Sequence, residues 1–170
     1  MQIFIMRHGE ASNQCLISNS SDALRPLTEL GKAEAKKMAQ WLAATQANPS
    51  EILVSPYLRA QQTCGHVVNI LAENGVEVVT QPKVLDFITP AGDAQQTHDY
   101  IDGLLAQYSD EKKVILLISH MPFVSYLVAQ LTQSQDMPIF ATGGIAQINY
   151  DSHLMQGQLV NLVSPAQVQS

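Results

Sequence analysis

Short apolar runs and longer segments of mixed polarity alternate along this chain. Apolar runs of this kind, bounded by polar or turn-forming residues, are typical of buried strands. They predict strands at Gln2–Met6, Glu51–Val54, Val76–Thr80, Val114–Ser119, Ala146–Tyr150 and Leu159–Leu162. Because strands that alternate with helices build βαβ units, this order favours an α/β fold with a mainly parallel sheet.

The segments between the strands carry helix start and stop signals. Thr28 is a residue type that caps helix N-termini, and Ser55-Pro56 combines an N-cap residue with a first-turn proline. The predicted helices run from Thr28 to about Ala44, from Ser55-Pro56 to Asn74-Gly75, from about Asp93 to Tyr108, and from Pro122 onward. Since no helical segment separates the last two strands, we expect them to form an antiparallel pair.

These elements predict the architecture of the whole chain. We expect a three-layer α/β/α sandwich, in which a mainly parallel central sheet ends in an antiparallel C-terminal strand pair. A length of 170 residues, of which 46% are hydrophobic, fits one domain that spans residues 1–170 and folds around its own core.

The net charge of the chain disfavours some classes of binding partner. Nine Lys and Arg against fifteen Asp and Glu give a formal net charge of −6. Such a charge disfavours binding to nucleic acid or to an anionic membrane surface. The chain starts without a basic leader and apolar core segment, and its longest aliphatic run, Val114–Ile118, is far too short to span a bilayer. We therefore expect a cytoplasmic protein, and we expect it to be a monomer.

Cysteine and histidine spacing predicts neither a disulfide framework nor a metal site. Cys15 and Cys64 lie far apart without a C-x-x-C pair, so we expect two reduced thiols. His66, His98 and His153 are scattered singly. No cluster with metal-ligand spacing is present in the sequence, and we expect no metal and no other cofactor.

Polar residues follow the predicted parallel strands where those strands end. The carboxyl ends of parallel strands share one edge of the sheet, which is where ligands bind in open α/β folds. Four segments are therefore expected on this edge: Arg7-His8-Gly9, Ser55–Arg59, Asp86–Asp93 and Ser119-His120.

Together with Arg25, these segments concentrate cations in an acidic protein. The guanidinium groups of Arg7, Arg25 and Arg59 have the fork geometry that suits phosphoryl oxygens. Neighbouring cations disfavour protonation of His8, and a neutral imidazole is a nucleophile that can attack phosphorus. The arginines and His120 would then stabilise charge on the phosphoryl oxygens, and Gly9 would let the backbone approach the phosphate.

Several motifs together resemble one known family. "RHGEA" after the first strand, "SPYLRAQQT" at the start of the second helix and "SHMP" after an aliphatic strand are similar to motifs of the histidine phosphatase (phosphoglycerate mutase-like) superfamily. "RPLTELGKAEA" and "LDFITPAGD" point to the phosphohistidine phosphatases within it. The resemblance extends from Gln2 to about Leu162, nearly the whole chain.

This resemblance implies a role for each matching residue. His8 would be the phosphorylated nucleophile, with Arg7 and Arg59 binding the phosphoryl group, His120 donating a hydrogen bond to it, and Arg25 completing the basic pocket. The implied substrate is a phosphohistidine on a signalling phosphotransfer domain or carrier protein, which would be the partner.

One departure from the family pattern leaves alternatives open. Most members that act on phosphate esters place a Glu or Asp in the pocket as a general acid. Here methionine follows His120, and Asp86 and Asp93 are the expected nearby carboxylates. Asp93 equally suits an N-cap for the third helix. The alternatives are a phosphate-ester phosphatase or mutase of the same fold, and a non-catalytic module that binds phosphohistidine.

Overall fold

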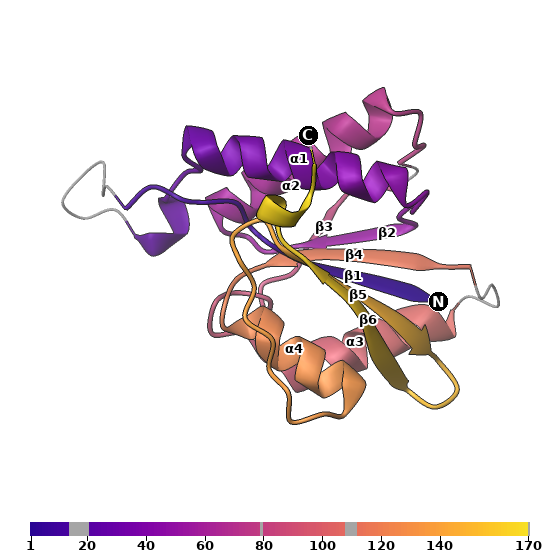
Figure 1. Ribbon diagram of the computed structural model, residues 1–170. Helices are drawn as coiled ribbons and strands as arrows, with labels where there is room; N and C mark the ends of the chain where they lie inside the picture. The colour runs from indigo at the N-terminus through magenta and orange to yellow at the C-terminus, as the bar shows by residue number, and fades with distance from the viewer. Residues whose placement is uncertain (14–20, 79, 108–111, 170) are drawn as a thin grey trace.

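A computed structural model describes residues 1–13, 21–78, 80–107 and 112–169. The described residues build the predicted three-layer α/β/α sandwich, with α1 and α2 on one face of the central sheet and α3 and α4 on the other (Figure 1). The strands are β1 (Gln2–Arg7), β2 (Glu51–Val54), β3 (Lys83–Val84), β4 (Val114–Ser119), β5 (Ile145–Asp151) and β6 (Gln156–Val163). The helices are α1 (Glu29–Ala44), α2 (Leu58–Glu73), α3 (Ala94–Ala106) and α4 (Phe123–Thr132), with short 3₁₀ helices η1 (Asp22–Leu24) and η2 (Pro165–Gln167).

The sheet is mainly parallel, as the sequence predicts. Its order is β3-β2-β4-β1-β5-β6. Strand β4 pairs in parallel with β1 on one side and with β2 on the other, and β3 is parallel to β2. Strand β5 is antiparallel to β1, and the expected antiparallel C-terminal pair is β5 with β6.

Strand β1 shows why the central strands are apolar at nearly every position. Ile3 and Ile5 pack into the core on the α3 and α4 face, whereas Phe4 and Met6 pack into the core on the α1 and α2 face. All four side chains are fully buried. A strand covered by helices on both faces has no polar side, so its sequence is a continuous apolar run.

Two of the three predicted helix caps are confirmed. The Thr28 side chain accepts a hydrogen bond from the Gly31 N–H at the start of α1, and Asp93 accepts one from the Gln96 N–H at the start of α3. The prediction for Ser55 is wrong, because α2 begins only at Leu58 and its N-cap residue is Tyr57. The Ser55 hydroxyl is instead a partner of a histidine in the candidate active site.

The third predicted strand, Val76–Thr80, is also wrong. Val76–Val78 and Thr80 are not in a strand, and Val79 lies outside the described residues. Val76, three residues after the end of α2, is buried in the part of the core that α1 and α2 cover. Lys83–Val84 pairs with β2 instead. The segment that follows β3 therefore still lies at the edge of the sheet where the parallel strands end.

The sequence predicts no membrane-spanning helix, no metal site and no disulfide. No described helix combines the length and the apolar composition that crossing a membrane requires. Within the described ranges, no group of three His, Cys, Asp or Glu side chains is arranged to hold a metal ion. Cys64 is a buried free thiol, and Cys15 lies outside the described residues. The cofactor-free, monomeric and cytoplasmic character of the protein stays a prediction.

Candidate active site

The register of the sheet brings the ends of β1, β2 and β4 together. Arg7 pairs with Ser119, and Val54 pairs with Ile118. The His8 N–H donates to the Ser119 carbonyl oxygen at 3.0 Å. The residues that follow these three strands therefore lie next to one another, and the rings of His8 and His120 have centroids 5.0 Å apart.

Hydrogen bonds assign the protons of the buried His8 ring. Its Nδ1 lies 2.6 Å from the Gly9 carbonyl oxygen, which can only accept, so Nδ1 carries the proton. Its Nε2 accepts a hydrogen bond from Arg59 Nε at 3.3 Å. The lone pair of His8 is therefore on Nε2, and it faces a guanidinium group.

Both histidine rings of the site are neutral at neutral pH. Burial lowers the pKa of His8 to about 4, the Gly9 carbonyl opposes this, and the charges of Arg59, Arg7 and Arg25 lower it further. Burial, followed by the proximity of His8 and Arg59, lowers the pKa of His120 to about 3. The neutral imidazole that the sequence predicts at His8 agrees with these surroundings.

Ser55 is a hydrogen-bond partner of His120. The Ser55 hydroxyl oxygen accepts the Tyr57 N–H at 3.3 Å and lies 2.7 Å from His120 Nε2. If the Ser55 hydroxyl donates its proton to Nε2, the histidine proton is on Nδ1. Within the described part of the chain, this buried Nδ1 has no hydrogen-bond partner.

The three predicted arginines reach the site from different elements. Arg7 ends β1, and its NH1 donates to the Phe140 carbonyl oxygen at 2.7 Å, while its buried Nε has no partner among the described residues. Arg59 lies in the first turn of α2 and is 4% exposed. Arg25 follows η1, and its charge lowers the pKa of His8, so it belongs to the same cluster.

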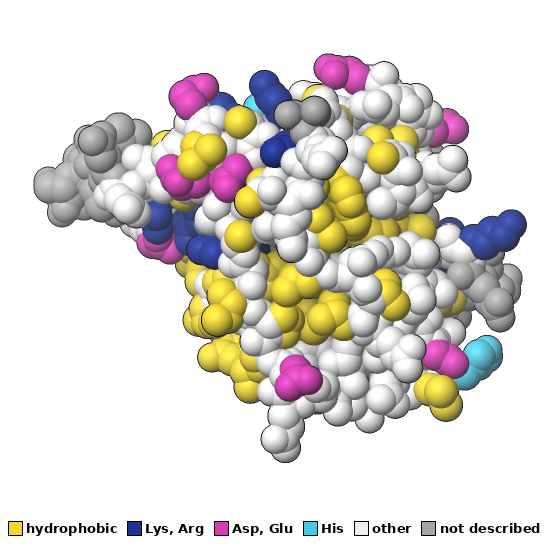
Figure 2. Space-filling model, in the orientation of Figure 1, with side chains coloured by type: hydrophobic (Ala, Val, Ile, Leu, Met, Phe, Trp, Pro, Cys, Tyr) yellow, Lys and Arg dark blue, Asp and Glu magenta, His cyan; other side chains and the backbone are white. Residues whose placement is uncertain are grey.

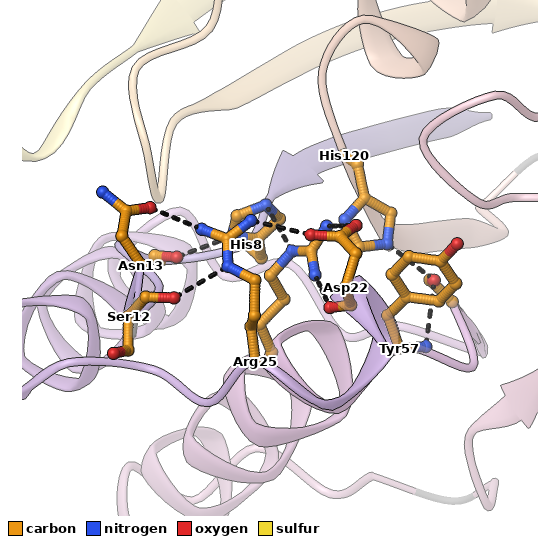
Figure 3. A network of polar contacts seen from close by, with 10 residues as sticks. His8, Ser12, Asn13, Asp22, Arg25, Tyr57 and His120 are labelled. Carbon is orange, nitrogen blue, oxygen red and sulfur yellow. Dashed lines mark hydrogen bonds and ion pairs between the residues drawn. The ribbon is translucent and has the colours of Figure 1, made fainter. Parts of the chain in front are cut away.

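Asp22 is a site residue that the sequence analysis missed. Its carboxylate accepts a hydrogen bond from Arg25 NH1 at 2.8 Å and one from Arg59 NH2 at 3.0 Å (Figure 3). Its carbonyl oxygen also accepts from Arg59 NH1 at 2.7 Å. The one available signal was the spacing of Asp22 and Arg25 in the segment "SDALRPLT", since an acidic residue three positions before an arginine can pair with it.

Within the described part of the chain, neither expected carboxylate is hydrogen-bonded to the histidines of the site. Asp93 caps α3. Asp86 is exposed in the turn after β3, and among the described residues it has no hydrogen bond or ion pair with the site. The carboxylate that contacts the site arginines comes instead from Asp22, 37 positions before Arg59.

Gly9 has a structural role, and its predicted contact with phosphate stays a prediction. Its N–H donates to Thr63 Oγ1 at 3.1 Å, and that hydroxyl donates to the Arg59 carbonyl oxygen. A Cβ atom on Gly9 would lie 2.3 Å from the Gly31 carbonyl oxygen in the first turn of α1. Glycine is required there because α1 packs directly against the backbone that carries His8.

Comparisons with known proteins agree with this geometry. The histidine phosphatase superfamily (branch 1) matches residues 3–87. Phosphohistidine phosphatase SixA of Escherichia coli (strain K12) is 38% identical over 151 residues, 89% of this chain and 86% of that protein. The SixA homolog of Haemophilus influenzae is 36% identical over 159 residues, 90% of each chain. The solved structure of the protein histidine phosphatase SixA complexed with tungstate matches with a TM-score of 0.86 and 36% identity, covering 98% of each chain. This chain therefore belongs to the histidine phosphatase superfamily.

Proposed function

We propose that this protein is a phosphohistidine phosphatase, which removes phosphate from a phosphorylated histidine of a signalling phosphotransfer domain or carrier protein. The observation that carries the proposal is the neutral His8 ring, whose Nε2 lone pair lies beside the Arg59 guanidinium in a cluster of three arginines. The E. coli relative is a phosphohistidine phosphatase, and the matching solved structure contains an oxyanion, tungstate.

The reaction takes place in two displacements at phosphorus. His8 Nε2 attacks the phosphoryl group, a P–N bond forms to His8, and the P–N bond to the substrate imidazole breaks. The substrate imidazole leaves with the bonding electron pair and is neutral, since its other nitrogen already carries a proton. Water then attacks the phosphohistidine, which releases inorganic phosphate and returns His8.

Two buried nitrogen atoms support a phosphoryl group at this position. Arg7 Nε and His120 Nδ1 have no hydrogen-bond partner within the described residues. A buried donor without a partner costs about 1–3 kcal/mol, so a ligand that supplies acceptors is favoured there. Phosphoryl oxygens are such acceptors, and with Arg25 and Arg59 these groups would stabilise the charge of the transition state.

A rate comparison tests the function against its alternatives. Turnover is measured on a phosphohistidine protein, a phosphotyrosine peptide and a sugar phosphate, with a metal chelator present throughout. We expect the phosphohistidine protein to be hydrolysed fastest and the chelator to have no effect. Preference for the sugar phosphate would indicate an ester phosphatase, and no turnover of any substrate would indicate a binding module.

Replacing Arg59 with alanine is expected to lower kcat by about 10²- to 10³-fold, because one preorganised donor to the transition state is lost. Affinity for tungstate should fall as well. Arg59→Lys is the matched control: it keeps the charge without the fork geometry, and we expect intermediate activity. Steady-state kinetics and calorimetric titration measure both effects. A variant with reduced thermal stability and unchanged kinetics would show that Arg59 is only structural.

Leu24 is expected to contact the phosphorylated partner. It is 60% exposed at the end of η1, one residue before Arg25. Leu24→Ser should raise KM for the phosphohistidine protein several-fold and leave KM for phosphoimidazole unchanged. The control is Leu154→Ser, which changes a similarly exposed leucine in the β5–β6 turn, at the opposite end of the strands. Equal effects of Leu24→Ser on both substrates would argue against docking at η1.

A further inference from the structure

The Asp22 carboxylate holds the two arginines on the solvent side of the site. Asp22 accepts from Arg25 through Oδ1 and from Arg59 through Oδ2 and its main-chain oxygen. Because Arg59 Nε donates to His8, each nitrogen of the Arg59 guanidinium is engaged. Figure 3 shows the Asp22 carboxylate among the side chains of His8, Arg25 and His120.

A carboxylate and a phosphoryl group are rival ligands for these donors. Both are anions with several acceptor oxygens, and arginine binds both through the same fork geometry. Under the proposed function, Arg25 and Arg59 bind the phosphoryl group. Asp22 therefore uses hydrogen-bond donors that the substrate also needs.

Asp22 is far more exposed to solvent than Arg59 and the two histidines of the site. His8, Arg59 and His120 are 7%, 4% and 1% exposed, whereas the Asp22 side chain is 52% exposed. On the surface, basic and acidic side chains lie together at one end of the molecule, at the left in Figure 2. The contacts of Asp22 with Arg59 must loosen before an external phosphoryl group can use those donors.

Asp22 remains an anion at neutral pH. Its hydrogen bond from Arg25 lowers its pKa, its slight burial opposes this, and Arg59 lowers the pKa again through a hydrogen bond and its charge. An ionised carboxylate repels an approaching phosphate, and it has no proton to give to a leaving group. Because it has no proton to donate, Asp22 cannot act as a general acid.

We propose that Asp22 is a specificity-determining residue, whose carboxylate competes with phosphoryl oxygens for Arg25 and Arg59 and so disfavours ligands that bring only a phosphate group. A phosphorylated protein offsets this competition with contacts around the site, including contacts with Leu24 on the same short helix. The same competition promotes release of the product phosphate. The inference rests on the proposed function, which assigns the two arginines to the phosphoryl group.

The first test is oxyanion binding, which requires no turnover. Calorimetric titration gives the Kd of inorganic phosphate and of tungstate for the wild type, Asp22→Asn and Asp86→Asn. Asparagine keeps the size of Asp22 and removes its charge, so we expect both anions to bind about tenfold tighter, a difference of about 1.4 kcal/mol. Asp86→Asn removes an equal charge from the exposed turn after β3 and should change Kd less than twofold. Unchanged binding to Asp22→Asn would overturn the proposal, and weaker binding would show that Asp22 organises the arginines instead.

The second test is substrate selectivity. We expect the ratio of kcat/KM for a phosphohistidine protein to kcat/KM for phosphoimidazole to fall about tenfold in Asp22→Asn, mainly because phosphoimidazole improves. Parallel changes on both substrates would contradict a role in specificity. Thermal unfolding checks that the variant is folded, and Asp22→Ser repeats the test without an amide. If wild-type protein forms no phosphoenzyme on His8, the proposed function fails, whereas normal labelling with unchanged selectivity in Asp22→Asn rejects only this inference.

Discussion

Replacing His8 with alanine is expected to abolish the phosphoenzyme and to lower turnover by several orders of magnitude. The reason is that Nε2 of His8 is the nucleophile of the proposed reaction, with its proton held on Nδ1 by the Gly9 carbonyl. Because the pKa of His8 is lowered to about 4, the ring is unprotonated at neutral pH and needs no base to activate it. A covalent nucleophile cannot be replaced by the arginines around it.

Rapid quenching after mixing with a phosphate-labelled substrate measures the intermediate. The label should be lost in acid, survive in alkali and map to the peptide that contains His8. His153→Ala is the control, since His153 is exposed near the β5–β6 turn, and this variant should label normally. Label recovered on serine, or near-normal turnover by His8→Ala, would refute the assignment. Because His8 is buried, the thermal unfolding of His8→Ala should be compared with that of the wild type.

The enzyme is expected to cleave P–N bonds far faster than alkyl P–O bonds. An alkoxide leaving group needs a proton, and general acid catalysis contributes about 10²- to 10⁴-fold where an acid is available. The substrate imidazole leaves as a neutral molecule whose conjugate acid has a reference pKa of about 6.5, so it needs no such proton. Asp22, the carboxylate within the site, is held in its ionised form by Arg25 and Arg59.

Measurements of kcat/KM on phosphohistidine, p-nitrophenyl phosphate and an alkyl phosphate test this selectivity. We expect alkyl phosphate to be very poor and p-nitrophenyl phosphate to be intermediate, because its phenolate is a better leaving group than an alkoxide. Asp86→Asn should change phosphohistidine turnover little, since Asp86 is exposed and, among the described residues, has no hydrogen bond or ion pair with the histidines. Efficient alkyl-ester hydrolysis that collapses in Asp86→Asn or Asp22→Asn would show that a general acid is present.

The sequence alone determined the central strands and the residues at their ends. Strands β2 and β4 have the predicted bounds, because a strand buried on both faces must be apolar at nearly every position. The ends of parallel strands share one edge of the sheet, so the proximity of His8 and His120 follows from the strand pattern itself. The caps Thr28 and Asp93 were also predictable, since a cap involves residues only three positions apart.

Only the tertiary structure decided which polar groups meet around those histidines. Ser55 has the residue type and position of a helix cap, yet its hydroxyl bonds to His120, 65 positions away. Asp22 lies outside the predicted strands and helices, so no local pattern marks it. It reaches the site because η1 packs against Arg59, 37 positions later. Gly9 is required by the approach of α1 rather than by its own backbone angles. Local sequence patterns report propensity and burial, whereas each of these contacts depends on how distant segments pack in three dimensions.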